Sequence, residues 1–203
     1  MELQETSIVL MGIKHCGKST LGKALASRLE CPFFDTDDLI TELTQKTPRQ
    51  IFTEQGAEGF EKAECNACKA LAKKSEEIEK AGQGSKAVIA TGGGICNNHN
   101  ALAQLRKLKT LFVFLEVSEE VAAARIVAEA AFKDGKISNL PAYIAKKNPH
   151  TIDDVRNIFH DFYVERTARY KEIADICVPL ENKSIEENTA NIVKLVTNFL
   201  KSN

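Results

Sequence analysis

Residues 12–20, with the sequence GIKHCGKST, constrain the fold of this chain more than any other stretch. They match the pattern G-x-x-x-x-G-K-[ST], in which the backbone wraps around phosphate groups and a lysine and a hydroxyl complete the cradle. The apolar run Ser7–Met11 before the loop is typical of a buried parallel strand, and apolar residues recur at helical spacing after it. We therefore expect the loop to join a strand to a helix N-terminus, where free N–H groups and the helix dipole attract anions.

The loop predicts a bound nucleoside triphosphate. The two glycines permit positive backbone dihedrals and close approach to phosphate. Lys18 is expected to neutralise the β and γ phosphates, and Ser19 to reach the magnesium ion that accompanies them. The predicted nucleotide-binding residues of the loop are Gly12, Cys16, Gly17, Lys18, Ser19 and Thr20.

Length and charge narrow the class of protein. A chain of 203 residues suits one α/β domain over residues 1–203. The net charge of −1 favours a small-molecule substrate over nucleic acid or an anionic membrane. The N-terminal sequence MELQETS lacks the features of a secretion signal, and no run of eighteen apolar residues follows. We expect a cytoplasmic monomer.

The six cysteines are scattered through predicted helices, strands and loops, so we expect reduced thiols. Cys65 and Cys68 form a C-x-x-C pair, but the pair lies in a helical stretch without a second pair, which disfavours zinc. Cys16 lies beside a lysine at a helix N-terminus, which leaves open whether its thiol is sensitive to oxidation or only fills the loop.

Strand and helix patterns alternate along the whole chain, which predicts a helix-covered parallel sheet of five strands. A helix with its N-cap at Ser118 is expected to run to about Phe132, and the capping box Ser184-x-x-Glu187 is expected to open the last helix. The five predicted strands are residues 7–11, 33–34, 87–91, 110–115 and 176–179.

Polar and glycine residues follow two of these strands at the sheet edge where ligands bind in open α/β sheets. Acidic residues cluster over 35–38, where Asp38 is also a candidate N-cap for a helix over 39–46. The glycines of 92–94 serve neither helix nor strand, so they indicate either a turn or a close approach to a ligand, with a flexible linker as the alternative.

Periodicity fails over residues 133–150, where polar, glycine and proline residues accumulate. A loop of this length predicts a mobile lid. Its lysines either bind phosphate or only keep the segment solvated.

The combination of GxxxxGKST, PFFDTD at 32–37, Ile51-Phe52 with Phe60, ATGGG at 90–94 and ERTARYKEIAD at 165–175 resembles the shikimate kinase family. The resemblance extends over nearly the whole chain. It implies a three-layer P-loop kinase fold with a five-stranded parallel sheet and a lid. It also implies ATP-dependent phosphorylation of the 3-hydroxyl of shikimate with Mg²⁺, a step toward chorismate and the aromatic amino acids.

The resemblance also implies roles for individual residues. Asp35 is similar to the acid associated with magnesium, and Asp37 to the acid that holds the acceptor hydroxyls and acts as base. Arg166 matches the arginine that binds the acceptor carboxylate, and Arg125 an arginine that lies against adenine. The other acceptor residues implied by the resemblance are Phe52, Phe60, Gly92, Gly93 and Gly94.

Two positions depart from the family pattern. Glu61 stands where the family has a second arginine for the shikimate carboxylate, and Leu140 stands where a lid arginine precedes Pro141. Three functions stay open: a shikimate kinase with a rearranged lid, a kinase of another small cyclic or polyol acceptor, and a nucleotide-binding protein with weak turnover. Lys133, Lys136, Lys146 or Lys147 is a candidate to replace the lid arginine.

Overall fold

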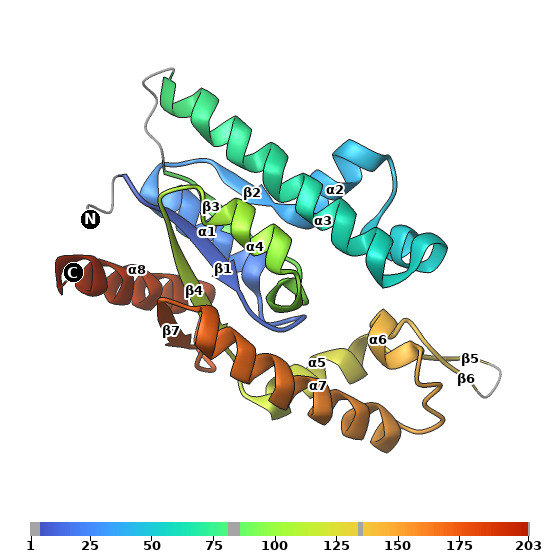
Figure 1. The fold of residues 1–203 in the computed structure, drawn as a ribbon. Helices are drawn as coiled ribbons and strands as arrows, with labels where there is room; N and C mark the ends of the chain where they lie inside the picture. The colour runs from blue at the N-terminus through green and yellow to red at the C-terminus, as the bar shows by residue number, and fades with distance from the viewer. Residues whose placement is uncertain (1–4, 81–85, 134–135, 203) are drawn as a thin grey trace.

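The computed structural model describes residues 5–80, 86–133 and 136–202. Its centre is a five-stranded sheet in the order β2-β3-β1-β4-β7, and every neighbouring pair is parallel (Figure 1). The predicted parallel sheet is confirmed. The strands are β1 Ser7–Met11, β2 Phe33–Asp35, β3 Val88–Ala90, β4 Thr110–Glu116 and β7 Ile176–Pro179.

The central strands carry the core. All five residues of β1 are buried, and Val9 pairs with Ile89 on one side and with Phe112 on the other. Helices cover both faces of the sheet (Figure 1), which explains why these strands are continuously apolar and do not alternate. Tyr170 of the helix that precedes β7 stacks on Phe114 of β4 with 5.2 Å between ring centroids.

The helices connect the strands in the predicted order, and α1 packs against α8 while α3 packs against α2 and α4. None of the helices that the structure describes has the length and apolar character needed to cross a membrane. The helices are α1 Lys18–Leu29, α2 Thr36–Thr44, α3 Pro48–Lys80, α4 His99–Leu105, α5 Glu119–Glu129, α6 Ala142–Ala145, α7 Ile152–Ile173 and α8 Ile185–Ser202, with a short 3₁₀ helix, η1, at Ile95–Asn97.

Local capping chemistry sets several helix ends. Glu30 adopts a left-handed conformation at the end of α1. Ser184 and Glu187 exchange side-chain bonds with each other's backbone N–H groups at the start of α8, which confirms the predicted capping box. A second capping box, between Thr151 and Asp154, opens α7.

An acid of the 35–38 cluster does cap the next helix, but it is Asp35 and not the candidate Asp38. The chain turns into α2 directly after β2, and Asp35 caps the helix by accepting a hydrogen bond from the Asp37 N–H at 3.0 Å. Asp38 is an exposed residue of the first helical turn. The helix begins three residues earlier than expected because a strand-terminal aspartate can satisfy the first free N–H groups.

The predicted extent of the helix to Phe132 is wrong. The segment predicted as a lid contains regular secondary structure. The helix α5 ends at Glu129, because Ala130 adopts an extended conformation. Strand β5, Ala131–Lys133, then pairs antiparallel with β6, Lys136–Ser138. The lid therefore holds a two-stranded hairpin and the short helix α6 (Figure 1).

Asp175, in the link between α7 and β7, ties three elements together. Its Oδ2 accepts a hydrogen bond from the Phe112 N–H of β4 at 2.7 Å and pairs with Arg106, just after α4, at 3.2 Å. Arg106 also donates to the Ile173 carbonyl at 2.7 Å and lies over the Phe112 ring at 3.9 Å. The carboxylate thus fixes α4 and α7 relative to the sheet.

Asp175→Ala should lower the free energy of unfolding by about 1–3 kcal/mol, because it leaves a backbone N–H and an arginine without their shared acceptor. Urea denaturation followed by circular dichroism measures the change. Asp153→Ala is the matched control, since the Asp153 side chain is 87% exposed and its pair with Arg156 spans 3.9 Å. Equal stabilities for the two variants would contradict the tie assigned to Asp175.

Candidate active site

The loop after β1 has the geometry that its motif predicts. Gly12 has a φ of 153° and Gly17 a φ of 99°, both in the region that favours glycine. A Cβ at Gly12 would lie 2.8 Å from the Cys16 Sγ and 2.9 Å from the Leu115 carbonyl oxygen. Both glycines are therefore required by the backbone path.

The side chains of the predicted triphosphate site converge on this loop. The Lys18 ammonium donates to the carbonyl oxygens of Gly12 and Ile13, each at 2.9 Å, so its charge lies inside the loop. Ser19 Oγ donates to Asp35 Oδ2 at 2.6 Å, which brings together the two residues predicted to bind magnesium. Thr20 is exposed in the first turn of α1.

Arg125 of α5 reaches the same loop from its outer side. Its Nη1 donates to the carbonyl oxygen of His15 at 2.7 Å. His15 Nδ1 in turn lies 3.3 Å from Glu129 Oε1, and burial lowers the pKa of this histidine. The structure therefore places Arg125 beside the nucleotide loop.

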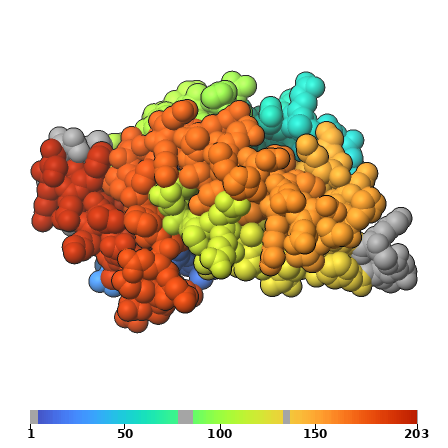
Figure 2. Space-filling model, turned by 90° about the horizontal axis from the view of Figure 1, so that it is seen from below, coloured from blue at the N-terminus to red at the C-terminus, as the bar shows by residue number. Residues whose placement is uncertain are grey.

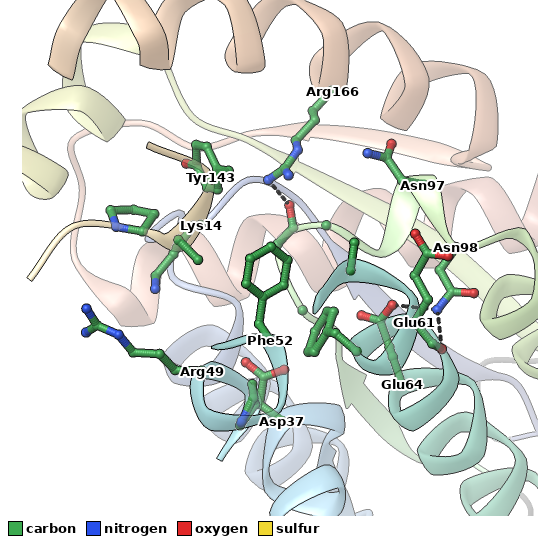
Figure 3. Close-up of a pocket in the computed structure, with 18 of the residues that line it drawn as sticks. Lys14, Asp37, Arg49, Phe52, Glu61, Glu64, Asn97, Asn98, Tyr143 and Arg166 are labelled. Atoms are coloured by element: carbon green, nitrogen blue, oxygen red, sulfur yellow. Dashed lines mark hydrogen bonds between the residues drawn. The ribbon is translucent and has the colours of Figure 1, made fainter. Parts of the chain in front are cut away.

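A cavity of about 330 Å³ opens next to the loop, and it collects every residue predicted for the acceptor (Figure 3). Phe52 and Phe60 meet edge to face in its wall, with ring centroids 6.4 Å apart. The lining residues that matter here are Lys14, Asp37, Arg49, Phe52, Phe60, Glu61, Glu64, Gly92, Gly93, Gly94, Asn97, Asn98 and Arg166, together with residues 139–143 of the lid.

The glycine triplet forms the floor of this cavity and is not a flexible linker. A Cβ at Gly92 would lie 3.0 Å from Glu64 Oε1 and 3.3 Å from Asp37 Oδ1, and one at Gly93 would lie 2.8 Å from the Lys14 N atom. The Gly92 N–H donates to Thr36 Oγ1 at 3.1 Å. Two carboxylates and the phosphate loop therefore approach the bare backbone closely, and the predicted approach of a ligand stays a prediction.

Three residues that line the cavity each carry a buried polar atom without a hydrogen-bond partner among the described residues: Asp37 Oδ1, Glu64 Oε1 and Arg166 Nε. The rest of each group is held in place. Asn98 Nδ2 donates to Glu64 Oε2 at 2.9 Å, and Arg166 Nη1 donates to the Gly93 carbonyl at 2.9 Å. A buried polar atom without a hydrogen bond lowers the stability of the fold unless a bound ligand supplies the missing partner. The cavity therefore fits a molecule with hydroxyl donors and an anionic group.

Glu64 is a site residue that the sequence analysis did not identify. It is 1% exposed, and burial raises its pKa to about 7, with Asp37 and Glu61 adding to the effect. Burial and the neighbouring Asp35 also raise the pKa of Asp37, against Lys18 and Lys14. The sequence offers one indication that Glu64 belongs to the site: it lies four residues after Phe60 and so shares its helical face.

The lid covers the cavity with mainly apolar side chains. Leu140, before Pro141, is 3% exposed and faces the cavity, and Tyr143 lies under the Arg166 guanidinium at 4.6 Å. Lys146 and Lys147 are exposed and do not line the cavity. The side chains of Lys133 and Lys136, the other candidates for a replacement cation, lie outside the described part.

The C-x-x-C pair contributes nothing to the site. Cys65 and Cys68 are both free thiols, and burial raises the pKa of the Cys68 thiol. Within the described ranges no group of three or more His, Cys, Asp or Glu side chains is arranged to hold a metal ion.

Comparison with known proteins assigns a family to this arrangement. The family model described as shikimate kinase matches residues 14–197. A shikimate kinase of Staphylococcus haemolyticus is 29% identical over 194 residues, which cover 96% of each chain.

Two solved structures share the fold. The shikimate kinase of Aquifex aeolicus has a TM-score of 0.68 and 27% identity over 98% of this chain and all of its own. The shikimate kinase of Acinetobacter baumannii, solved in complex with shikimate, has a TM-score of 0.71 and 22% identity over 96% of this chain and 94% of its own.

Glu64→Gln should raise the free energy of unfolding at pH 8 by up to about 3 kcal/mol and leave it unchanged near pH 4. Because the pKa of Glu64 rises from 4.5 to about 7 on folding, the unfolded chain loses this proton first, and the wild type loses stability as the pH rises through that window. Urea titrations at pH 4, 6 and 8 measure the difference. Glu58→Gln, an exposed change in the same helix, is the control, and parallel curves for wild type and Glu64→Gln would contradict the assignment.

Proposed function

This chain belongs to the shikimate kinase family, and we propose from that premise how its residues perform the ATP-dependent phosphorylation of shikimate. The proposed residue roles rest on the cavity beside the phosphate loop. In the residues that line it, two carboxylate oxygens and one guanidinium nitrogen are buried without hydrogen-bond partners among the described residues. A ring acid with several hydroxyl groups supplies the complementary donors and acceptor.

Shikimate matches this set group by group. Its carboxylate can accept a charge-assisted hydrogen bond from Arg166, whose guanidinium is already oriented by Gly93 and by the rings of Tyr143 and Phe162. Its hydroxyls can donate to Asp37 Oδ1 and Glu64 Oε1. Its ring carbons fit against Phe52 and Phe60.

Asp37 is the group we assign as general base toward the 3-hydroxyl. Its carboxylate faces Gly92 at the floor of the cavity, and burial raises its pKa, which makes it a better proton acceptor than an exposed aspartate. Lys18 lies in the adjacent loop, where its charge can neutralise the β and γ phosphates. Phosphoryl transfer depends mainly on such positioning and charge stabilisation, so few residues need to react chemically.

Ser19 and Asp35 fit a magnesium ion. Their hydroxyl and carboxylate oxygens lie 2.6 Å apart at the opening of the phosphate loop, and Mg²⁺ prefers oxygen ligands of this kind. When bound, the ion supplies neutralising charge to the β and γ phosphate oxygens.

The remaining nucleotide roles follow from position. We propose that residues 12 and 16–20 cradle the ATP phosphates and that Arg125 lies against adenine, since its bond to His15 holds it at the loop. A single domain with a moving lid, a monomeric state, a cytoplasmic location and the lack of nucleic-acid or membrane partners stay predictions from the sequence.

One observation favours a second candidate, a neutral polyol acceptor. Glu61 is exposed at the cavity, beside Asn98, whose Nδ2 donates to the Glu61 carbonyl oxygen at 2.9 Å. A glutamate at this point repels a carboxylate and attracts hydroxyl or amino groups.

Wild-type enzyme should phosphorylate shikimate with a kcat/KM about 10 to 100 times higher than for its carboxamide, because only the acid makes the charge-assisted bond to Arg166. ADP formation in a coupled assay measures both substrates. An equal or higher kcat/KM for the carboxamide would instead establish the neutral acceptor. If neither shikimate nor its carboxamide is turned over, the result supports a nucleotide-binding protein with weak turnover.

Glu61→Arg should lower the KM for shikimate about tenfold and leave the KM for ATP unchanged, because it replaces repulsion of the carboxylate with a charged donor. Glu58→Arg makes the same charge change on an exposed position of the same helix and should change neither constant. If both variants lower the KM for shikimate equally, the effect is general electrostatics and the role given to Glu61 is wrong.

A further inference from the structure

Three cations line the cavity, and they lie in different places. Arg166 is engaged with Gly93 and two aromatic rings. In Figure 3, Lys14 and Arg49 lie on one side of Phe52 and Asp37, opposite Glu61, Glu64 and the two asparagines. Lys14 belongs to the phosphate loop, so the end of the cavity that Arg49 shares with it is the phosphate end.

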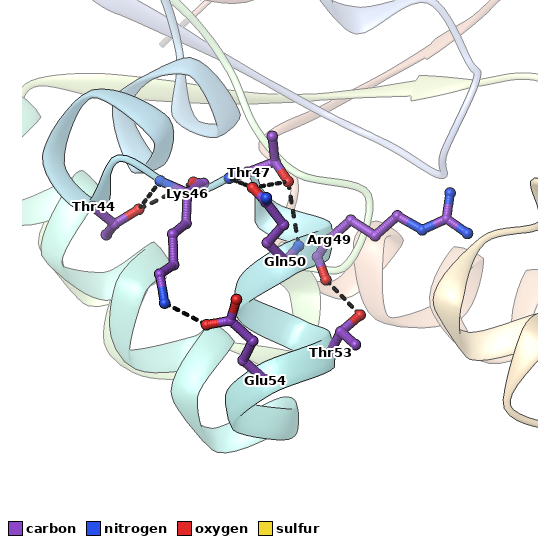
Figure 4. Close-up of polar contacts among 7 residues, drawn as sticks. All are labelled: Thr44, Lys46, Thr47, Arg49, Gln50, Thr53 and Glu54. Carbon is purple, nitrogen blue, oxygen red and sulfur yellow. Dashed lines mark hydrogen bonds and ion pairs between the residues drawn. The ribbon is translucent and has the colours of Figure 1, made fainter.

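The surroundings of Arg49 leave its guanidinium available. At the start of α3, Lys46 pairs with Glu54, and Gln50 Oε1 accepts from the Thr47 N–H at 2.8 Å (Figure 4). The Arg49 side chain points away from this network. It is exposed and has no hydrogen-bond or ion-pair partner among the described residues, although its helix turn is firmly held.

The lid places no described cation at this end of the cavity. The lid residues that line it are Asn139, Leu140, Pro141, Ala142 and Tyr143. Phosphoryl transfer develops charge on the equatorial oxygens of the transferring group, and an arginine at that point is a common requirement for rapid turnover. Among the residues that the structure describes, a cation at this end of the cavity therefore comes from an element other than the lid.

We propose, on the basis of the function above, that Arg49 meets the transferring phosphoryl group from α3. In the step, the bond from the γ phosphorus to the ADP oxygen breaks as the bond to the acceptor oxygen forms, and the hydroxyl proton passes to Asp37. The Arg49 guanidinium donates to the phosphoryl oxygens while they carry the most charge. Its planar fork suits this task better than a lysine.

Arg49→Ala should lower kcat about 10²- to 10³-fold while the KM values for shikimate and ATP change less than about threefold. Arg49→Lys should keep part of the rate because it keeps a point charge. Added guanidinium at millimolar concentration should restore part of the kcat of Arg49→Ala and have no such effect on wild type. Rescue of this kind does not follow from a merely structural role.

Lys46→Ala is the matched control, because it removes a cation that adjoins the same helix but pairs with Glu54 and does not line the cavity. Lys146→Ala tests a lid lysine in the same way. Both should keep the wild-type kcat.

The inference is overturned if Arg49→Ala keeps the wild-type kcat, or if it raises only the KM for shikimate, which would make Arg49 a ligand of the acceptor carboxylate. It is also overturned if Lys146→Ala alone produces the loss in kcat. These outcomes all require a wild type that phosphorylates shikimate. Failure of the wild type on shikimate would count against the proposed function itself.

Discussion

The order of the parallel strands determines the active site. Because β2, β3 and β1 are neighbours and run in one direction, the segments that follow them emerge at one edge of the sheet. Three segments therefore meet at this edge: the acids after β2, the glycine triplet after β3 and the phosphate loop after β1. The bond from Ser19 to Asp35 and the close approach of Gly93 to Lys14 are direct results of this order.

The cavity is electrostatically incomplete without a ligand. Asp37 and Glu64 bring two carboxyl groups to the same glycine, and Arg166, which is held by Gly93 and aromatic rings, keeps its Nε without a partner among the described residues. An excess of buried acid lowers the stability of the empty protein near neutral pH, but the same atoms give the acceptor its hydrogen bonds. Stability and binding are thus opposed at this site, as is common where function requires buried polar groups.

Motif and periodicity are sufficient for the sheet and the phosphate loop, because each depends on local sequence next to a strand. The acceptor roles of Asp37 and Arg166 come from the family resemblance, and the structure brings both residues to one cavity. Contacts between segments that are distant in the sequence cannot be predicted from local patterns. The hairpin of β5 and β6 forms through pairing that competes with helix propensity, so Phe132 was assigned to the wrong element. Propensity favours Asp38 over Asp35 as the helix cap because the strand ends later and the helix begins earlier than propensity indicates.

Glu64 and Arg49 show a different limit. Both lie on α3 among many charged residues, and only the folded chain shows which of these charges face the cavity. Burial distinguishes Glu64 from its exposed neighbours, and a lack of local partners distinguishes Arg49 from Lys46. Neither property is encoded in a short pattern.

The bend in α3 has a consequence for how the acceptor pocket can work. Gly56, with φ 72° and ψ −165°, interrupts the helix in a conformation that is essentially restricted to glycine, and nothing lies within 4 Å of the position its Cβ would take. Glycine is therefore required here by the backbone conformation and not by a lack of space for a side chain. Arg49 and Phe52 lie before the bend, and Phe60 and Glu64 lie after it, so the dihedrals of Gly56 set how these two parts of α3 are placed around the cavity. The shape of the pocket therefore depends on the backbone conformation of one glycine that is not among the residues lining it.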